Sequence, residues 1–299
     1  MEYFVSINNV NTREQLEKIG VKHFVCGMQQ FSCRQSISFD YQQLDCFVRD
    51  CKEKVYVLVN ALIEEKYLDD LRLHLKKIIE CGIEGIFFQD FGVLNICKKL
   101  QFQGQMIYAP DTLNTNYATL NVLLYQGVTM AFLAREISLE QKLEIVAHSK
   151  MPLMMQVHGV EYMAYSKRHL LTNYYEHHKI EDKGNNFIQA TGVDYRCHIY
   201  EDRNGTHILS EKQMECLSIF EQVKDIPYGY IESMYLSDNE LVDVVTSYFQ
   251  EDKLQAKNWL QEKYPNVAYY HSFLFDETVY KMEDVRKREA DEKNIKISK

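Results

Sequence analysis

The chain has 299 residues, of which 46% are apolar and 26% charged, so it can bury a sizeable core and is not globally disordered. Its length fits one eight-unit barrel of roughly 250 residues and is too short for such a barrel with a second large domain. The net charge of −9, from 43 acidic and 34 basic residues, argues against a broad surface for polyanions but not against a local basic patch.

Strand-like and helix-like segments alternate in the first half of the chain, at the spacing of βα units. Short apolar runs predict seven strands, at 3–7, 23–27, 55–59, 85–88, 106–109, 130–134 and 153–157. Amphipathic segments between them predict helices at 12–20, 41–51, 64–82, 93–100, 117–127 and 139–149. In the last of these, Ser138 and Gln141 have the spacing of a capping box.

The eighth strand is delayed until YGYIES at 228–233. Before it, Asn204-Gly205 lies between two β-rich runs, which is a strong hairpin signal. Residues 211–225 and 238–263 have helical patterns, and the charged segment 281–299 is typical of a solvated tail. The expected fold is an α/β (β/α)8 TIM-like barrel with a β-hairpin inserted after the seventh strand. We expect a barrel domain at 1–250, with the hairpin at about 185–210, and a C-terminal helix and charged tail at 251–299.

Nothing in the sequence marks the chain for export or for a membrane. The segment after Met1 lacks the basic start, long apolar stretch and cleavage site of a signal peptide, and no stretch approaches 18 apolar residues. The eight cysteines form no C-x-x-C pair, as is usual for reduced structural thiols. We therefore expect a cytoplasmic protein that does not contact a membrane.

Polar residues follow six of the apolar runs. They are Asn60, Gln89 with Asp90, Asp111 with Thr112, Arg135 with Glu136, His158, and Glu232. The carboxyl ends of barrel strands meet on one face, where barrel enzymes carry their chemistry, so these side chains are expected at one mouth. His158, Glu232, Arg135 and Glu136 are the candidate catalytic residues, and Asn60, Gln89, Asp90 and Asp111 are the candidates for substrate binding.

Each candidate also has an ordinary structural interpretation. Arg135 and Glu136 form either a structural ion pair or a site for an anionic group. His158 either points into the mouth beside Gly159 or is buried in the core. Asp90, Asp111 and Glu232 form an acidic cluster for acid–base chemistry or a divalent cation, or the two aspartates only cap helices. No metal site is assigned. The motifs of P-loop hydrolysis, the serine elbow and the zincin proteases do not occur.

The segment MMQVHGVEYMAYSKRHLLTNY at 154–174 resembles the signature of the collagenase-like peptidases, peptidase family U32, which reads approximately E-x-F-V-H-G-A-x-C-x-A-x-S-G-R-C-x-L-S. Supporting segments lie in the same order at 59–62, 88–94, 114–120, 133–141, 207–210 and 230–233, so the resemblance covers roughly residues 1 to 250. The arginine of the signature falls on Arg168, which the resemblance implies is a substrate-binding residue.

The chain departs from this signature at its cysteines. Tyr162 and His169 stand where the family has cysteine, Lys167 replaces a glycine, and residues 183–196 contain no cysteine. After Glu232, Ser233-Met234 replaces Gly-Arg, which puts a family anion contact in doubt. Cysteines of this region hold a four-iron four-sulfur cluster in some members, and such a cluster needs about four thiolates. Only Cys197 and Cys216 lie near, so we expect no iron–sulfur cluster and no other cofactor in this chain.

The resemblance implies hydroxylation without molecular oxygen, including 5-hydroxyuridine formation at the tRNA wobble position, often by unequal pairs of family members. This chain is similar to a cysteine-poor member of such a pair. The expected function is an accessory, cluster-free subunit whose partners are a longer, cysteine-containing paralogue and, through the complex, tRNA. The alternatives are a collagenase-like peptidase and a non-catalytic scaffold.

Overall fold

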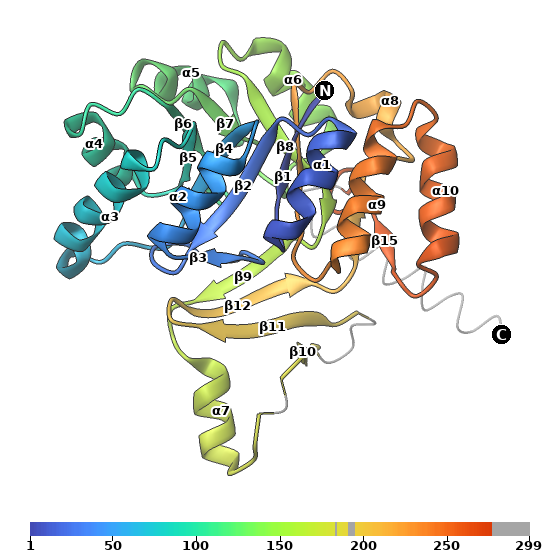
Figure 1. Cartoon of the computed structure of the whole chain (residues 1–299). Helices are drawn as coiled ribbons and strands as arrows, with labels where there is room; N and C mark the ends of the chain where they lie inside the picture. Colours follow the sequence, from blue (N-terminus) through green and yellow to red (C-terminus); the bar gives the residue numbers. More distant parts are fainter. Residues whose placement is uncertain (183, 191–194, 277–299) are drawn as a thin grey trace, which may run out of the picture.

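A closed barrel of parallel strands forms the body of the molecule (Figure 1). The computed structural model describes residues 1–182, 184–190 and 195–276. Within them, each barrel strand pairs in parallel with the next, and the last strand pairs with both the first and the seventh, which closes the ring. The barrel strands are β1 (Glu2–Ser6), β2 (His23–Met28), β4 (Lys54–Val59), β5 (Gly85–Phe88), β6 (Gln105–Tyr108), β7 (Met130–Phe132), β8 (Leu153–Gly159) and β14 (Tyr228–Ile231). The predicted (β/α)8 barrel is confirmed.

Helices connect successive strands and cover the outside of the barrel (Figure 1). They are α1 (Arg13–Ile19), α2 (Tyr41–Asp50), α3 (Leu68–Glu80), α4 (Phe91–Lys99), α5 (Tyr117–Tyr125) and α6 (Leu139–His148), with α9 (Asp238–Phe249) and α10 (Lys253–Lys263) after β14. The expected capping box of Ser138 and Gln141 begins α6. Short 3-10 turns, η1 (Val10–Thr12) and η2 (Glu65–Tyr67), precede α1 and α3.

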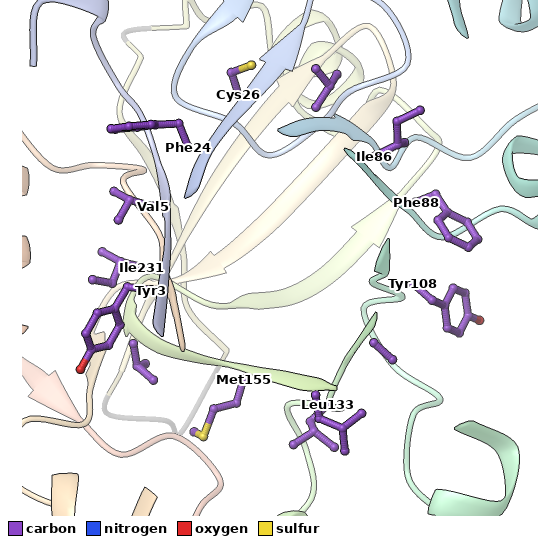
Figure 2. Packing of buried hydrophobic residues seen from close by; sticks show 14 of the residues in the cluster. Tyr3, Val5, Phe24, Cys26, Ile86, Phe88, Tyr108, Leu133, Met155 and Ile231 are labelled. Carbon is purple, nitrogen blue, oxygen red and sulfur yellow. The ribbon is translucent and has the colours of Figure 1, made fainter. Parts of the chain in front are cut away.

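Two apolar layers hold the barrel, because successive strand side chains point to opposite faces. Residues such as Tyr3, Val5, Phe24 and Met155 point outward against the helices, and Figure 2 shows them around the outside of the ring of strands. The inward side chains fill the barrel, and most are large; they are Phe4, Val25, Tyr56, Leu58, Phe87, Ile107, Met130, Phe132, Met154 and Tyr230. The barrel is therefore a packed core below its mouth.

A second sheet is inserted between β8 and β14, and Figure 1 shows it across the end of the barrel toward which β2 points. Its strand order is β10 (Asn186–Ile188), β11 (Cys197–Asp202), β12 (Gly205–Ser210) and β9 (Tyr162–Ser166), all antiparallel, with α7 (Leu170–His178) after β9. Asn204-Gly205 lies at the turn between β11 and β12. The insertion is thus larger than the hairpin expected at about 185–210.

The segment expected to be helical at 211–225 is mostly not helical. Its β13 (Gln213–Glu215) pairs with the end of β8, and only α8 (Phe220–Val223) is α-helical. Short strands β3 (Ser38–Phe39) and β15 (Tyr269–Tyr270) add to β2 and β13. The charged tail expected at 281–299 lies outside the described residues. In the described part of the chain, none of the helices has both the length and the apolar character needed to span a membrane.

Candidate functional site

The mouth of the barrel encloses a cavity of about 60 Å³, enough for a few water molecules. Its floor is aromatic, formed by Phe87, Phe132 and Tyr230, and the inserted sheet covers it with Tyr162 and Leu209. The polar side chains around it come from several strand ends and one loop; they are Arg34, Asn60, Asp111, Arg135, Gln156 and Glu232. Four of the expected site residues, Asn60, Asp111, Arg135 and Glu232, therefore share one cavity.

One carboxylate lies between two guanidinium groups in this cavity. Nη2 of Arg34 is 2.8 Å from Oδ2 of Asp111, and Nη1 of Arg135 is 3.8 Å from its Oδ1. Nε of Arg135 also donates to Oε1 of Gln156 at 3.3 Å. Both cations lie against rings, Arg34 over Tyr162 and Arg135 over Phe132. Arg135 is therefore paired with Asp111 and Gln156, and not with Glu136, so the structural ion pair that was one of its two interpretations does not form.

The loop after β2 places Arg34 in the mouth. Two of its residues, Phe31 and Arg34, have positive φ angles of 61° and 55°, which cost energy for residues other than glycine. The side chain of Asn60 holds this loop: its Oδ1 accepts from the backbone N–H of Cys33 at 2.9 Å and its Nδ2 donates to the carbonyl of Cys33 at 3.0 Å. Asn60 thus positions the neighbouring Arg34.

Glu232 follows β14 and lies in the cavity without a cationic hydrogen-bond partner. Its Oε1 accepts from the hydroxyl of Ser6 and from the backbone N–H of Met234, both at 3.0 Å. Burial raises the pKa of Glu232, more than these hydrogen bonds and the charge of Arg135 lower it. Gly159 leaves room for the backbone of Glu232, because a Cβ at residue 159 would lie only 2.5 Å from the carbonyl oxygen of Glu232. A carboxyl group in this environment is suited to donate a proton.

A second, wider groove of about 320 Å³ adjoins the mouth cavity. Both are lined by Arg34, Pro110, Asp111 and Tyr162, so the groove leads to the inner cavity. Gln89, Asp90 and Thr112 line this groove rather than the inner cavity. Asp90 also caps α4 by accepting from the N–H of Gly92 at 2.7 Å, so its capping interpretation holds.

His158 does not point into the mouth. A bulge in β8 pairs Tyr230 with Gln156 but Ile231 with His158, so Val157 is an extra residue and the side-chain alternation shifts. The ring of His158 is fully buried between Tyr248 and Tyr269, with centroid distances of 5.7 and 5.8 Å. This burial lowers the pKa of His158 to about 3. The expectation that it faces the mouth is wrong, and Gln156 occupies the inward position.

Two more expected residues lie away from the mouth cavity and the groove. Glu136 is partly buried and lines neither of them. Arg168 is exposed on the inserted sheet, and its backbone contacts Ser166 and Thr206. Below the mouth, the buried amine of Lys142 donates to the carbonyl oxygens of Ala134 and Arg135, which fixes the end of β7. Burial lowers the pKa of Lys142 to about 8.

Sequence reasoning missed three residues of the mouth. Arg34 is in a loop rather than at the end of an apolar run, Gln156 precedes a bulge, and Tyr162 comes from the insertion. The only sequence signal for Tyr162 was its place at a signature cysteine. Within the described residues, no group of three or more His, Cys, Asp or Glu side chains has the geometry to hold a metal ion. The expected lack of an iron–sulfur cluster stays a prediction.

Comparisons with known proteins give one family model and several similar proteins. The model of peptidase family U32 matches residues 8–293. tRNA hydroxylation protein P2 of Bacillus subtilis (strain 168) is 27% identical over 291 residues, which cover 89% of this chain and 94% of that protein. tRNA hydroxylation protein P of Escherichia coli (strain K12) is 29% identical over 161 residues, or 52% of this chain and 35% of that protein. Among solved structures, the U32 peptidase Mk0906 has a TM-score of 0.49 and 10% identity, covering 77% of this chain and 92% of that one.

Proposed function

We propose a function from the premise that this chain belongs to peptidase family U32, which confirms the resemblance seen in its sequence. The chain acts in the hydroxylation of tRNA, as an accessory, cluster-free subunit for 5-hydroxylation of the wobble uridine. The observation that carries this proposal is the nearly end-to-end similarity to tRNA hydroxylation protein P2.

The proposed partner is a longer, cysteine-containing paralogue. The relatives differ in length, which supports this partner. The match to this chain covers almost all of protein P2 but only about a third of protein P. The cysteine-poor signature segment of this chain supports the proposal that any iron–sulfur chemistry belongs to the partner. This chain would then contribute its barrel, an interface and a polar pocket.

The side chains of the mouth support a pocket that binds an anionic group and donates a proton. Two guanidinium groups face one aspartate. An anionic group that binds beside Asp111, or in its place, would therefore have an arginine to contact. Glu232, whose pKa burial raises, is available as the proton donor. His158 takes no part, because it lies outside the cavity.

The test is a deletion of the gene followed by mass analysis of tRNA nucleosides. We expect 5-hydroxyuridine to fall and to return when the wild-type chain is supplied, and affinity purification of the tagged chain to recover a longer family member. Unchanged hydroxyuridine in the deletion strain would reject the proposal. Cleavage of gelatin by the purified chain, lost on Glu232→Gln, would instead support the peptidase alternative. Recovery of hydroxyuridine by a chain with the mouth disabled would favour the scaffold.

A further inference from the structure

Three tyrosine side chains line the groove beside the mouth. Tyr108, Tyr162 and Tyr165 line it together with Arg34 at its inner end. The rings come from two different elements, since Tyr108 ends β6 while Tyr162 and Tyr165 belong to β9 of the inserted sheet. Aromatic side chains and arginine planes are the surfaces on which unpaired RNA bases stack.

The size of the groove fits one small ring system. Its volume of about 320 Å³ is near the lower end of ligand sites, which range over about 300–1,000 Å³. Gln89, Asp90, Thr112 and Asn204 add amide, carboxylate and hydroxyl groups between the rings. A pyrimidine base has two flat faces and a polar edge. The tyrosine rings suit its faces, and the polar side chains suit its edge.

Basic side chains lie near the outer end of the groove, in segments that flank its lining residues. Lys66 and Lys167 both pair with Glu64, at 3.3 and 2.6 Å, two residues from the lining residue Leu62. Arg168 and Arg203 are exposed on the inserted sheet, next to the strand and the turn that supply Tyr165 and Asn204. Acidic side chains lie among these cations, including Glu64, Glu201 and Asp202. The phosphates on either side of an inserted nucleotide would therefore be held by individual lysine and arginine contacts rather than by a net positive field.

We infer that this groove binds a single unstacked pyrimidine nucleotide from an RNA loop. The base lies among Tyr108, Tyr162 and Tyr165 with its inner edge toward Arg34, and the backbone phosphates lie over Lys66, Lys167, Arg168 and Arg203. This inference rests on the proposed function for its ligand class but concerns how this chain itself contacts RNA. An extended peptide is the competing occupant; the groove offers it little, because three aromatic rings suit a flat base better than an extended backbone.

Photo-crosslinking of the full-length purified chain tests the inference. The probe is a hairpin RNA with a single-stranded loop that contains one 4-thiouridine, and the same hairpin with the thiouridine paired in the stem is the RNA control. We expect crosslinks from the loop probe to peptides that contain Tyr108, Tyr162 or Tyr165. Crosslinks confined to other surfaces, or equal yields from the paired control, would overturn the inference.

Binding of the same fluorescent loop RNA gives a quantitative check. Tyr162→Leu and Tyr165→Leu are each expected to weaken binding roughly 5- to 150-fold, the range for loss of one base stack. Tyr125→Leu is the matched control, because Tyr125 is exposed at the end of α5 and lines neither the mouth cavity nor the groove. Arg168→Ala is expected to reduce the salt dependence of binding by about one phosphate contact, whereas Lys98→Ala is not. Equal affinity of all five proteins and the wild type would overturn the inference.

The two hypotheses fail in different experiments. Suppose that the deletion strain loses hydroxyuridine but the tyrosine variants bind RNA as well as the wild type does. The proposed function then stands, and the inference that the groove binds RNA is rejected. RNA crosslinks in the groove, with unchanged hydroxyuridine in the deletion strain, keep the groove and reject the proposed function. If a tyrosine variant does not fold, the crosslink map of the wild-type chain still decides. Saturable binding of a gelatin peptide that displaces the loop RNA would point to the peptide instead.

Discussion

Asn60 holds the backbone of Cys33 through both ends of its side-chain amide, with distances of 2.9 and 3.0 Å. The loop it holds contains positive φ angles at Phe31 and Arg34, a conformation that persists only when surrounding contacts enforce it. This single side chain therefore connects the end of β4 to the position of the Arg34 guanidinium.

Replacing Asn60 by alanine should destabilise the fold at this loop. Two half-buried backbone groups lose their partners, so we expect Asn60→Ala to lower the free energy of unfolding by about 1–3 kcal/mol in urea denaturation. Asn121→Ala is the control, because Asn121 also binds backbone groups, of Lys150 and His148, but through exposed hydrogen bonds. A loss no larger than that of the control would contradict the role of Asn60.

The two arginines of the mouth should respond differently to lysine. Arg34 makes the shorter, more buried contact with Asp111, so Arg34→Lys is expected to lower the free energy of unfolding by about 1.5–3 kcal/mol. Arg135 is 3.8 Å from Asp111, and Arg135→Lys should cost less stability but reduce tRNA hydroxylation in cells, because the forked geometry is lost. Thermal melting and nucleoside analysis measure the two effects. If Arg135→Lys lowers the melting temperature and leaves hydroxylation intact, its role is structural.

His158 should make the fold sensitive to acid. Burial lowers the pKa of His158 to about 3 from 6.5, so below pH 6.5 the unfolded chain takes up a proton that the folded chain does not. Stability is therefore lost as the pH falls through this window, by roughly 2 kcal/mol between pH 7.5 and pH 5. His158→Leu should remove that part of the pH dependence in urea titrations, and the exposed control His148→Leu should keep it. Parallel curves for His158→Leu and the wild type would disprove the assignment.

Glu232 should change the stability of the fold with pH in the opposite direction to His158. Burial raises the pKa of Glu232 above 4.5, so the folded chain holds a proton that the unfolded chain releases, and stability falls as the pH rises through the folded pKa. Glu232→Gln, which keeps an oxygen to accept from Ser6 and Met234, is expected to gain stability relative to the wild type as the pH rises above 4.5. Glu140→Gln on α6 is the exposed control. A gain that does not depend on pH would contradict the prediction.

Iron content tests the cofactor prediction directly. Purified without oxygen, the chain is expected to be colourless and free of iron, because the signature segment at 154–174 has no cysteine and a cluster needs about four thiolates. Metal analysis and absorption spectroscopy are the measurements. Stoichiometric iron with a thiolate-to-iron absorption band would show that other cysteines supply the ligands.

The sequence predicted the barrel because its signal is periodic and local. Apolar runs of strand length recur with helical segments between them, and their polar ends identified Asn60, Asp111, Arg135 and Glu232 as neighbours. It misplaced His158, since a one-residue bulge reverses which face a side chain occupies and leaves no pattern of its own. Arg34 was missed because a loop held in place by a distant asparagine has no periodicity to recognise.

The long insertion before β14 has a consequence for how the chain folds. The first seven strands are complete at residue 159, but the strand that joins β8 to β1 begins at residue 228. During synthesis, β1 and β8 are therefore the two open edges of an incomplete sheet until the insertion has emerged, and open edges invite pairing with other chains. Within the described residues, β13 pairs with β8 only at Gly159 and His158, so it shields little of that edge. Chains truncated before residue 228 should consequently aggregate rather than form a smaller folded unit.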